Sequence, residues 1–168
     1  MQINQIPLAR LLGARKLSSR LERLASISLF GQLSPGELGI IDGLLHHREY
    51  LAGEIVFDQG EEGQAIYIIY EGEISIDLQG LGEVGHIATL AAGDFFGDMA
   101  LLDNLPRAAR AKAHTPAKLA VFFRNDFMAL MDTHARIASK IALQIAREMG
   151  RRLRLVHSSE TQAWRQHL

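Results

Sequence analysis

The chain has 168 residues, a length that predicts one domain with appended helices and no second folded module of ordinary size. Apolar residues make up 48% and charged residues 22%, which excludes long disorder, collagen and pure coiled coils. The absence of cysteine excludes disulfides, thiolate metal sites and cysteine nucleophiles. No apolar run approaches the roughly 18 residues of a spanning helix and no secretory signal is visible, so we expect a cytoplasmic protein without membrane association.

The net charge of −1 conceals an uneven distribution along the chain. Residues 1–28 carry a net charge of +4, residues 29–133 carry −10, and residues 134–168 carry +5. There is no lysine or arginine from Leu51 through Pro106, so Arg107 is the first basic residue after a long acidic stretch. We expect the basic ends to complement the acidic middle.

The first part of the chain is predicted to be helical. Residues 7–27 place leucines at three- and four-residue spacings with arginines between them, which indicates one or two amphipathic helices. Such helices bind acidic membranes in some proteins, but packing on the acidic middle of this chain is the favoured interpretation. Ser34, Pro35 and Glu37 then form a helix start, with a short helix predicted to about Leu45.

From Arg48 the hydrophobic period changes to two. Short runs such as EIVF, AIYIIY and EISIDL are separated by glycine turns, and after an interruption at residues 96–106 two more strands are predicted. This pattern indicates an antiparallel sandwich or barrel. Asn125 and Asp126 are predicted to cap a helix through about Met131.

A long helix is predicted from Ala135 to Val156. Its apolar stripe consists of Ile137, Ile141, Ile145, Met149 and Leu153. The fold class is therefore mainly β with flanking helices. We divide the chain into a helical segment (1–28), a β-barrel domain (29–133) and a C-terminal helix with its tail (134–168).

The interruption GDFFGDMALLDNLPRAA, from Gly93 to Ala109, carries the chemistry. Gly97 and Asp98 are predicted to form a tight turn that opens a short helix, with the acid in its first turn and amide groups available to an anion. Arg107 follows nine residues later, and a guanidinium binds a phosphodiester through two parallel hydrogen bonds. The segment therefore predicts a nucleotide phosphate–ribose site, whereas Arg107 alone would also fit an ion pair with a barrel acid.

This segment resembles the phosphate-binding cassette of the cyclic nucleotide-binding domain family, whose pattern runs F-G-E-x-A-L and, after a short turn, P-R-A-A. The segments LFGQLS, AGEIVFDQGEEG and YIIYEGEI also match family features, so the resemblance extends from about Leu29 to Val156. It implies an eight-stranded antiparallel jelly-roll barrel (a double-stranded β-helix) like the sensor domain of the catabolite activator protein.

The resemblance also implies roles for individual residues. Arg107 would bind the exocyclic phosphate oxygens, joined by the backbone N–H groups of Ala100 and Ala108, while Gly97 and Asp98 would meet the ribose 2′-hydroxyl. The implied ligand-binding residues are Gly97, Asp98, Met99, Ala100, Arg107, Ala108 and Ala109.

Two positions bear on ligand choice. Asp98 stands where the family usually has glutamate and is one methylene shorter, so we expect a longer ribose contact and weaker binding. Ala108 stands where a serine or threonine favours guanine, so the chain resembles the members that prefer cAMP. Ile145, Met149, Leu153 and Trp164 are candidates for covering the base, although core or dimer packing is the favoured role of each.

We therefore expect a non-enzymatic, stand-alone sensor that binds cAMP or another 3′,5′-cyclic nucleotide, needs no cofactor, and acts through a homodimer or a protein partner. Only 12 residues follow Val156, so the helix-turn-helix of related transcription factors, and with it DNA binding, is not expected. The alternative is a ligand-free interaction module of the same fold. His46, His47, His86 and His114 would suggest a cupin-like metal enzyme, but the spacing of metal ligands is missing.

Overall fold

The computed structural model describes residues 19–80 and 84–165. Only the last part of the predicted basic segment falls within this range, as α1 (Ser19–Ser26), and residues 7–18 lie outside the described residues. The next helix, α2 (Pro35–Asp42), begins as predicted. The Ser34 side chain accepts a hydrogen bond from the Glu37 N–H at 3.4 Å and the Glu37 carboxylate accepts one from the Ser34 N–H at 2.7 Å, which is a capping box.

Within the described residues, eight strands follow the first two helices and confirm the predicted antiparallel barrel. Four of them form a sheet against the helices, the helix-side sheet, in the order β1-β8-β3-β6, and the others form the outer sheet in the order β2-β7-β4-β5. The strands are β1 (His46–Tyr50), β2 (Ile55–Phe57), β3 (Ala65–Glu71), β4 (Ile74–Gln79), β5 (Val84–Leu90), β6 (Phe95–Phe96), β7 (Arg110–Ala113) and β8 (Ala117–Phe123).

The alternation of side chains along β3 explains why this strand is apolar on both faces. Ile66 and Ile68 pack into the core shared with the helices, whereas Ile69 packs into a second core between the two sheets. All three are fully buried. The helix-side sheet is therefore packed on one face by the helices and on the other by the outer sheet.

Three helices lie within and after the barrel: α3 (Met99–Leu102), α4 (Arg124–Thr133) and α5 (Ala135–Arg165). The predicted caps Asn125 and Asp126 are wrong, because α4 begins at Arg124 with Phe123 as its N-cap. The last helix is also longer than predicted, since no glycine or proline ends it at Val156.

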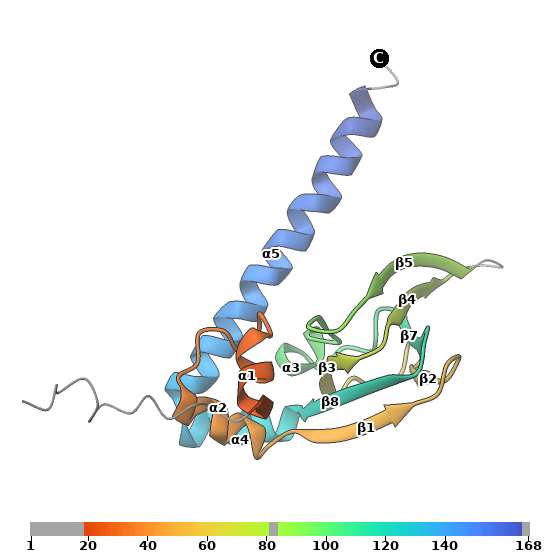
Figure 1. Cartoon of the computed structure of the whole chain (residues 1–168). Helices are drawn as coiled ribbons and strands as arrows, with labels where there is room; N and C mark the ends of the chain where they lie inside the picture. The colour runs from red at the N-terminus through yellow and green to blue at the C-terminus, as the bar shows by residue number, and fades with distance from the viewer. Residues whose placement is uncertain (1–18, 81–83, 166–168) are drawn as a thin grey trace, which may run out of the picture.

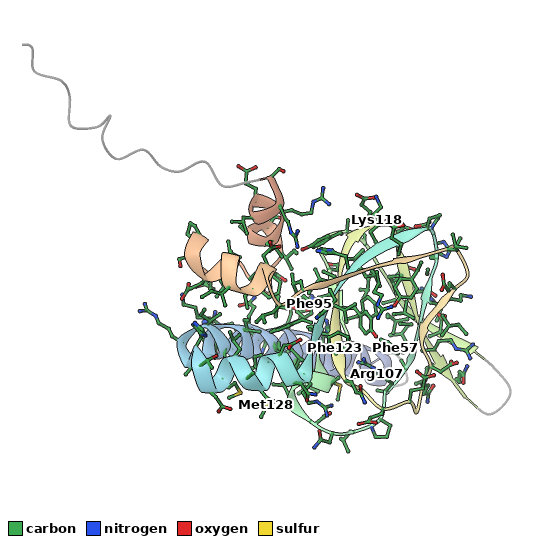
Figure 2. The ribbon with its side chains drawn as sticks, turned by 90° about the horizontal axis from the view of Figure 1, so that it is seen from below. Phe57, Phe95, Arg107, Lys118, Phe123 and Met128 are labelled. Carbon is green, nitrogen blue, oxygen red and sulfur yellow. The ribbon has the colours of Figure 1, made fainter. Side chains whose placement is uncertain are left out.

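The first turns of α5 pack against the barrel domain and the rest of the helix extends beyond it (Figure 1). Ile137, Ile141 and Ile145 are buried, whereas Met149 and Leu153 are 36% and 58% exposed. Figure 2 shows the helices along one side of the barrel, with Phe57 and Arg107 on the barrel side. No helix within the described residues has the length and hydrophobicity needed to cross a membrane.

Candidate functional site: a cavity around Arg107 and α3

Gly97 makes the sharp turn between β6 and α3. Its φ of +73° lies in the left-handed region that favours glycine. A Cβ at this position would lie 2.6 Å from Nη1 of Arg107. The turn therefore needs glycine for its backbone conformation and also to make room for the guanidinium.

Asp98 directly precedes α3 as its N-cap residue, one position before the first turn in which the sequence places it. Its backbone is helical (φ −62°, ψ −33°), and its carboxylate makes no capping hydrogen bond to α3. The side chain instead forms an ion pair with Arg152 on α5, with Nη1 of Arg152 3.1 Å from Oδ1 and 3.3 Å from Oδ2. The prediction of an acid in the first turn of α3 is thus corrected by one position, because α3 begins at Met99 and its first turn contains no acid.

Arg107 is a buried guanidinium with free hydrogen-bonding capacity. Only 8% of the residue is exposed, and its Nη1 and Nη2 donate to the carbonyl oxygens of Gly97 (3.1 Å) and Ala65 (2.9 Å). Its Nε finds no hydrogen-bond partner among the described residues. The guanidinium carbon lies 4.0 Å from the centroid of the Phe57 ring. Burial lowers the pKa of Arg107.

The backbone of Arg107 is fixed by the loop between β2 and β3. Its N–H donates to the carbonyl of Glu61 at 2.8 Å, and its carbonyl accepts from the N–H of Gly60 at 2.9 Å. No carboxylate in the described part of the chain forms an ion pair with its side chain. The ion-pair alternative for Arg107 therefore finds no support in 19–80 and 84–165.

The predicted site residues all border one cavity of about 670 Å³. These residues are Gly97, Asp98, Met99, Ala100, Arg107, Ala108 and Ala109. Ala100 is buried and its N–H donates to the carbonyl of Gly97 at 3.2 Å, while Ala108 is exposed.

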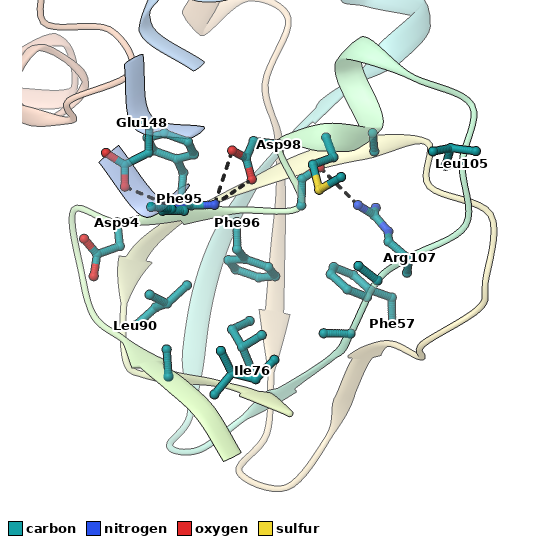
Figure 3. Close-up of a pocket in the computed structure, with 18 of the residues that line it drawn as sticks. Phe57, Ile76, Leu90, Asp94, Phe95, Phe96, Asp98, Leu105, Arg107 and Glu148 are labelled. Carbon is teal, nitrogen blue, oxygen red and sulfur yellow. Dashed lines mark hydrogen bonds and ion pairs between the residues drawn. The ribbon is translucent and has the colours of Figure 1, made fainter. Parts of the chain in front are cut away.

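The two ends of the cavity differ in chemistry. Figure 3 shows Arg107 and Phe57 at one end and Glu148 at the other, with Ile76 and Leu90 along the wall between them. The cavity thus offers a cation at one end, an apolar wall and a charged rim on α5.

The side of α5 that borders the cavity is charged. Glu148, Arg151 and Arg152 line the cavity, and both arginines pair with Glu148. Hydrogen bonds from Arg151 hold the pKa of Glu148 below its usual value. Charged side chains of α5 therefore border the cavity at the place where the base covers were considered.

None of the aliphatic candidates faces the cavity. Ile145 is buried in the core with the other helices. Met149 and Leu153 do not border the cavity. The side chain of Trp164 lies outside the described side chains. The difference arises because a stripe that advances by four residues turns about 40° at each step, so Met149 and Leu153 rotate away from the face on which Glu148 and Arg152 follow the buried Ile141 and Ile145.

Sequence reasoning also missed Arg124, the first residue of α4. Its guanidinium donates to the carbonyls of Gly63 and Ala100 and to the side chain of Asn104. It therefore ties the C-terminal part of α3 to the loop before β3. The only signal in the sequence was an arginine directly after an apolar strand.

Such a geometry suits a small anion that carries hydroxyl groups. A buried guanidinium without a carboxylate partner is able to bind a phosphate, and a carboxylate directly before α3 is able to accept from a sugar hydroxyl. A profile of the family described as "Cyclic nucleotide-binding domain" matches residues 47–134. The chain belongs to the cyclic nucleotide-binding domain family.

Relatives within this family support the assignment. The cyclic AMP receptor protein of Thermus thermophilus is 34% identical over 122 residues, which cover 72% of this chain and 56% of that protein. A cAMP-dependent protein kinase regulatory subunit of Mycosarcoma maydis is 41% identical over 90 residues, or 54% of this chain and 17% of that subunit.

The fold agrees with a solved member of the same family. The crystal structure of the Thermus thermophilus catabolite activator protein superposes with a TM-score of 0.72 at 32% identity, covering 80% of this chain and 62% of that one. This likeness confirms the mainly β jelly-roll fold. This chain covers less than two thirds of each of these relatives, so their whole-protein activities do not transfer with the fold.

Proposed function

We propose that this protein is a cyclic nucleotide sensor whose preferred ligand is cAMP. The observation that carries the proposal is the buried guanidinium of Arg107, which lines the cavity without an ion-pairing carboxylate among the described residues. Burying such a charge unpaired is unfavourable, so a bound phosphate would offset the cost. The names of the two relatives, a cyclic AMP receptor protein and a cAMP-dependent kinase subunit, point in the same direction.

In this proposal each part of the ligand meets a matching surface. The exocyclic phosphate oxygens accept from Arg107, whose Nε lacks a partner among the described residues. The base lies against the apolar wall that includes Ile76 and Leu90. Ala108 offers no hydroxyl to the 2-amino group of guanine, which favours adenine.

The output is proposed to run through α5. The buried half of its stripe, represented by Ile141, packs with the barrel domain, whereas Met149 and Leu153 are exposed in the half that projects beyond it. We propose that this second half forms a homodimer or binds a protein partner. Nucleotide binding would change the position of α5 only if the ligand interacts unequally with its two positions.

A ligand-free interaction module is the second candidate. The observation that favours it is the Asp98–Arg152 ion pair, because the Asp98 side chain in this contact is only 4% exposed. In that case the barrel would be retained for its surfaces and the cavity would bind no nucleotide.

Isothermal titration calorimetry with cAMP and with cGMP distinguishes the two candidates. The sensor proposal predicts saturable binding with one nucleotide per chain and a lower Kd for cAMP than for cGMP. Absence of binding by either nucleotide to folded protein would favour the ligand-free module.

A further inference from the structure

Arg124, the first residue of α4, donates hydrogen bonds to two segments that are distant from it in the sequence. Its Nε donates to the carbonyl of Ala100 in α3, its Nη1 to the side chain of Asn104, and its Nη2 to the carbonyl of Gly63 in the loop before β3. Within residues 19–80 and 84–165 it forms no ion pair with a carboxylate. The whole guanidinium is therefore used to hold these segments together.

The helix that Arg124 holds is too short to fix its own orientation. α3 has four residues, and a single turn is not stable by itself because nucleating a helix costs more than one turn of hydrogen bonds returns. Only one side of α3 is packed. Ala100 and Leu101 are buried, whereas the residues on either side of them are 44% and 47% exposed. Contacts with neighbouring segments therefore decide where the N–H groups of α3 point.

The contact with Gly63 brings this arrangement next to Arg107. A Cβ added to Gly63 would lie 2.9 Å from the Cβ of Ala100 and 3.5 Å from the Nε of Arg107. The backbone of Gly63 is thus adjacent both to α3 and to the guanidinium that the proposed function assigns to the phosphate. Arg124 itself does not border the cavity. Its hydrogen bonds are therefore placed to fix α3 relative to Arg107 without a contact to the ligand.

The N–H of Ala100 is available to a bound anion. It donates to the carbonyl of Gly97 at 3.2 Å, which is the long end of the usual range. That carbonyl also accepts from Nη1 of Arg107 at 3.1 Å. The Ala100 N–H can therefore turn to a phosphate oxygen without leaving the carbonyl of Gly97 unpaired.

We infer that Arg124 is a positioning residue that aligns the Ala100 N–H with the Arg107 guanidinium, so that both meet the same phosphate. The inference rests on the proposed function. A phosphate held by Arg107 alone lacks the hydrogen bond from α3. One hydrogen bond to a charged group changes affinity about tenfold to a hundredfold.

The charge of Arg124 offers a competing explanation. Burial lowers the pKa of Arg107 most, and the positive charge of Arg124 lowers it further, so the two cations lie close enough to interact. A cation at this distance also attracts a phosphate through space. Lysine keeps the charge but lacks the planar fork that reaches three acceptors. Arg124→Lys therefore separates positioning from simple attraction.

The first experiment measures the Kd for cAMP by calorimetry. We expect the Kd to rise at least about tenfold in Arg124→Met and at least about fivefold in Arg124→Lys. Arg20→Met is the matched control, because it removes an arginine that pairs with Asp42 away from the cavity and makes the same change in net charge. Its Kd should stay within about twofold of the wild-type value.

Nuclear magnetic resonance at saturating cAMP distinguishes positioning from a general loss of stability. In the wild type, cAMP should shift both the amide signal of Ala100 and the Nε–H signal of Arg107. In Arg124→Met the Arg107 signal should still shift, whereas the shift of the Ala100 signal should be clearly smaller. Asn104→Ala removes one acceptor of Arg124 at an exposed residue, so it should fold and show the same selective change.

Three results would overturn the inference and leave the sensor proposal intact. These are an unchanged Kd in folded Arg124→Met, full affinity in Arg124→Lys, and an Ala100 signal that responds to cAMP equally in wild type and variant or in neither. If Arg124→Met does not fold, the Ala100 signal of Asn104→Ala decides in the same way. If the wild-type protein binds no cyclic nucleotide, the sensor proposal fails and this inference fails with it.

Discussion

Replacing Arg107 by methionine should separate ligand binding from folding. The guanidinium donates two hydrogen bonds to carbonyl groups, each worth about 1.5–3 kcal/mol because the donor is charged. Against this, a residue that is only 8% exposed and has no carboxylate partner among the described residues loses several kcal/mol of solvation. The carbonyl of Gly97 keeps a donor in the N–H of Ala100.

These opposing contributions nearly cancel in the free protein. We expect the free energy of unfolding of Arg107→Met to lie within about 1 kcal/mol of the wild-type value. With ligand the balance changes, because the phosphate loses a desolvated charge partner worth roughly 2–5 kcal/mol. The Kd for cAMP should therefore rise about thirtyfold to several thousandfold.

Urea unfolding without ligand and calorimetry with cAMP measure the two effects separately. A loss of more than about 3 kcal/mol of stability would show that Arg107 mainly supports the fold, since such losses accompany broken buried networks. Unchanged affinity in the folded variant would show that the nucleotide binds elsewhere. Either result would refute the reasoning for Arg107.

Three further predictions address the turn, the helix packing and the output. Gly97→Ala should weaken cAMP binding at least about tenfold in calorimetry, because its Cβ would displace Arg107. Gly93→Ala is the control, since Gly93 also has a positive φ (+98°) but has no described atom within 4 Å of an added Cβ. This control should lose only about 1–2 kcal/mol of stability on denaturation and keep its affinity for cAMP. Lys140 donates to Glu37 at 2.7 Å, and this contact is the largest cause that lowers the pKa of the Glu37 carboxyl to about 2. The pair therefore stabilises the fold above about pH 4.5, and its contribution of about 1 kcal/mol is lost as the pH falls toward 2. The difference in unfolding free energy between wild type and Glu37→Gln should shrink below about pH 4.5, and a constant difference would contradict this. Addition of cAMP should change the hydrogen-exchange protection of residues 145–156 in α5 as well as that of residues 97–109. A change confined to 97–109 would leave α5 without a role in signalling.

The elements that the sequence predicted well are those set by local chemistry. The two-residue period gave the strands, and Ser34 with Glu37 gave a capping box that depends on residues three apart. Gly97 was predicted at the turn because a tight turn into a helix requires a residue that tolerates positive φ. The isolated position of Arg107 in an acidic stretch marked it as a candidate ligand for an anion.

The features that the sequence did not predict depend on how distant elements are oriented. The Asp98–Arg152 pair joins residues 54 positions apart and requires the rotation of α5 about its own axis. The same rotation decides that Glu148 borders the cavity while Leu153 does not. Hydrophobic periodicity finds the buried face of a helix but does not show which polar edge meets a neighbouring loop.

A crystal structure of the protein grown with saturating cAMP tests the central claim most directly. We expect the cyclic phosphate within hydrogen-bond distance of the Arg107 guanidinium and the ribose 2′-hydroxyl within hydrogen-bond distance of Asp98. A nucleotide bound outside this cavity, or a cavity that stays empty at saturating cAMP, would contradict this expectation.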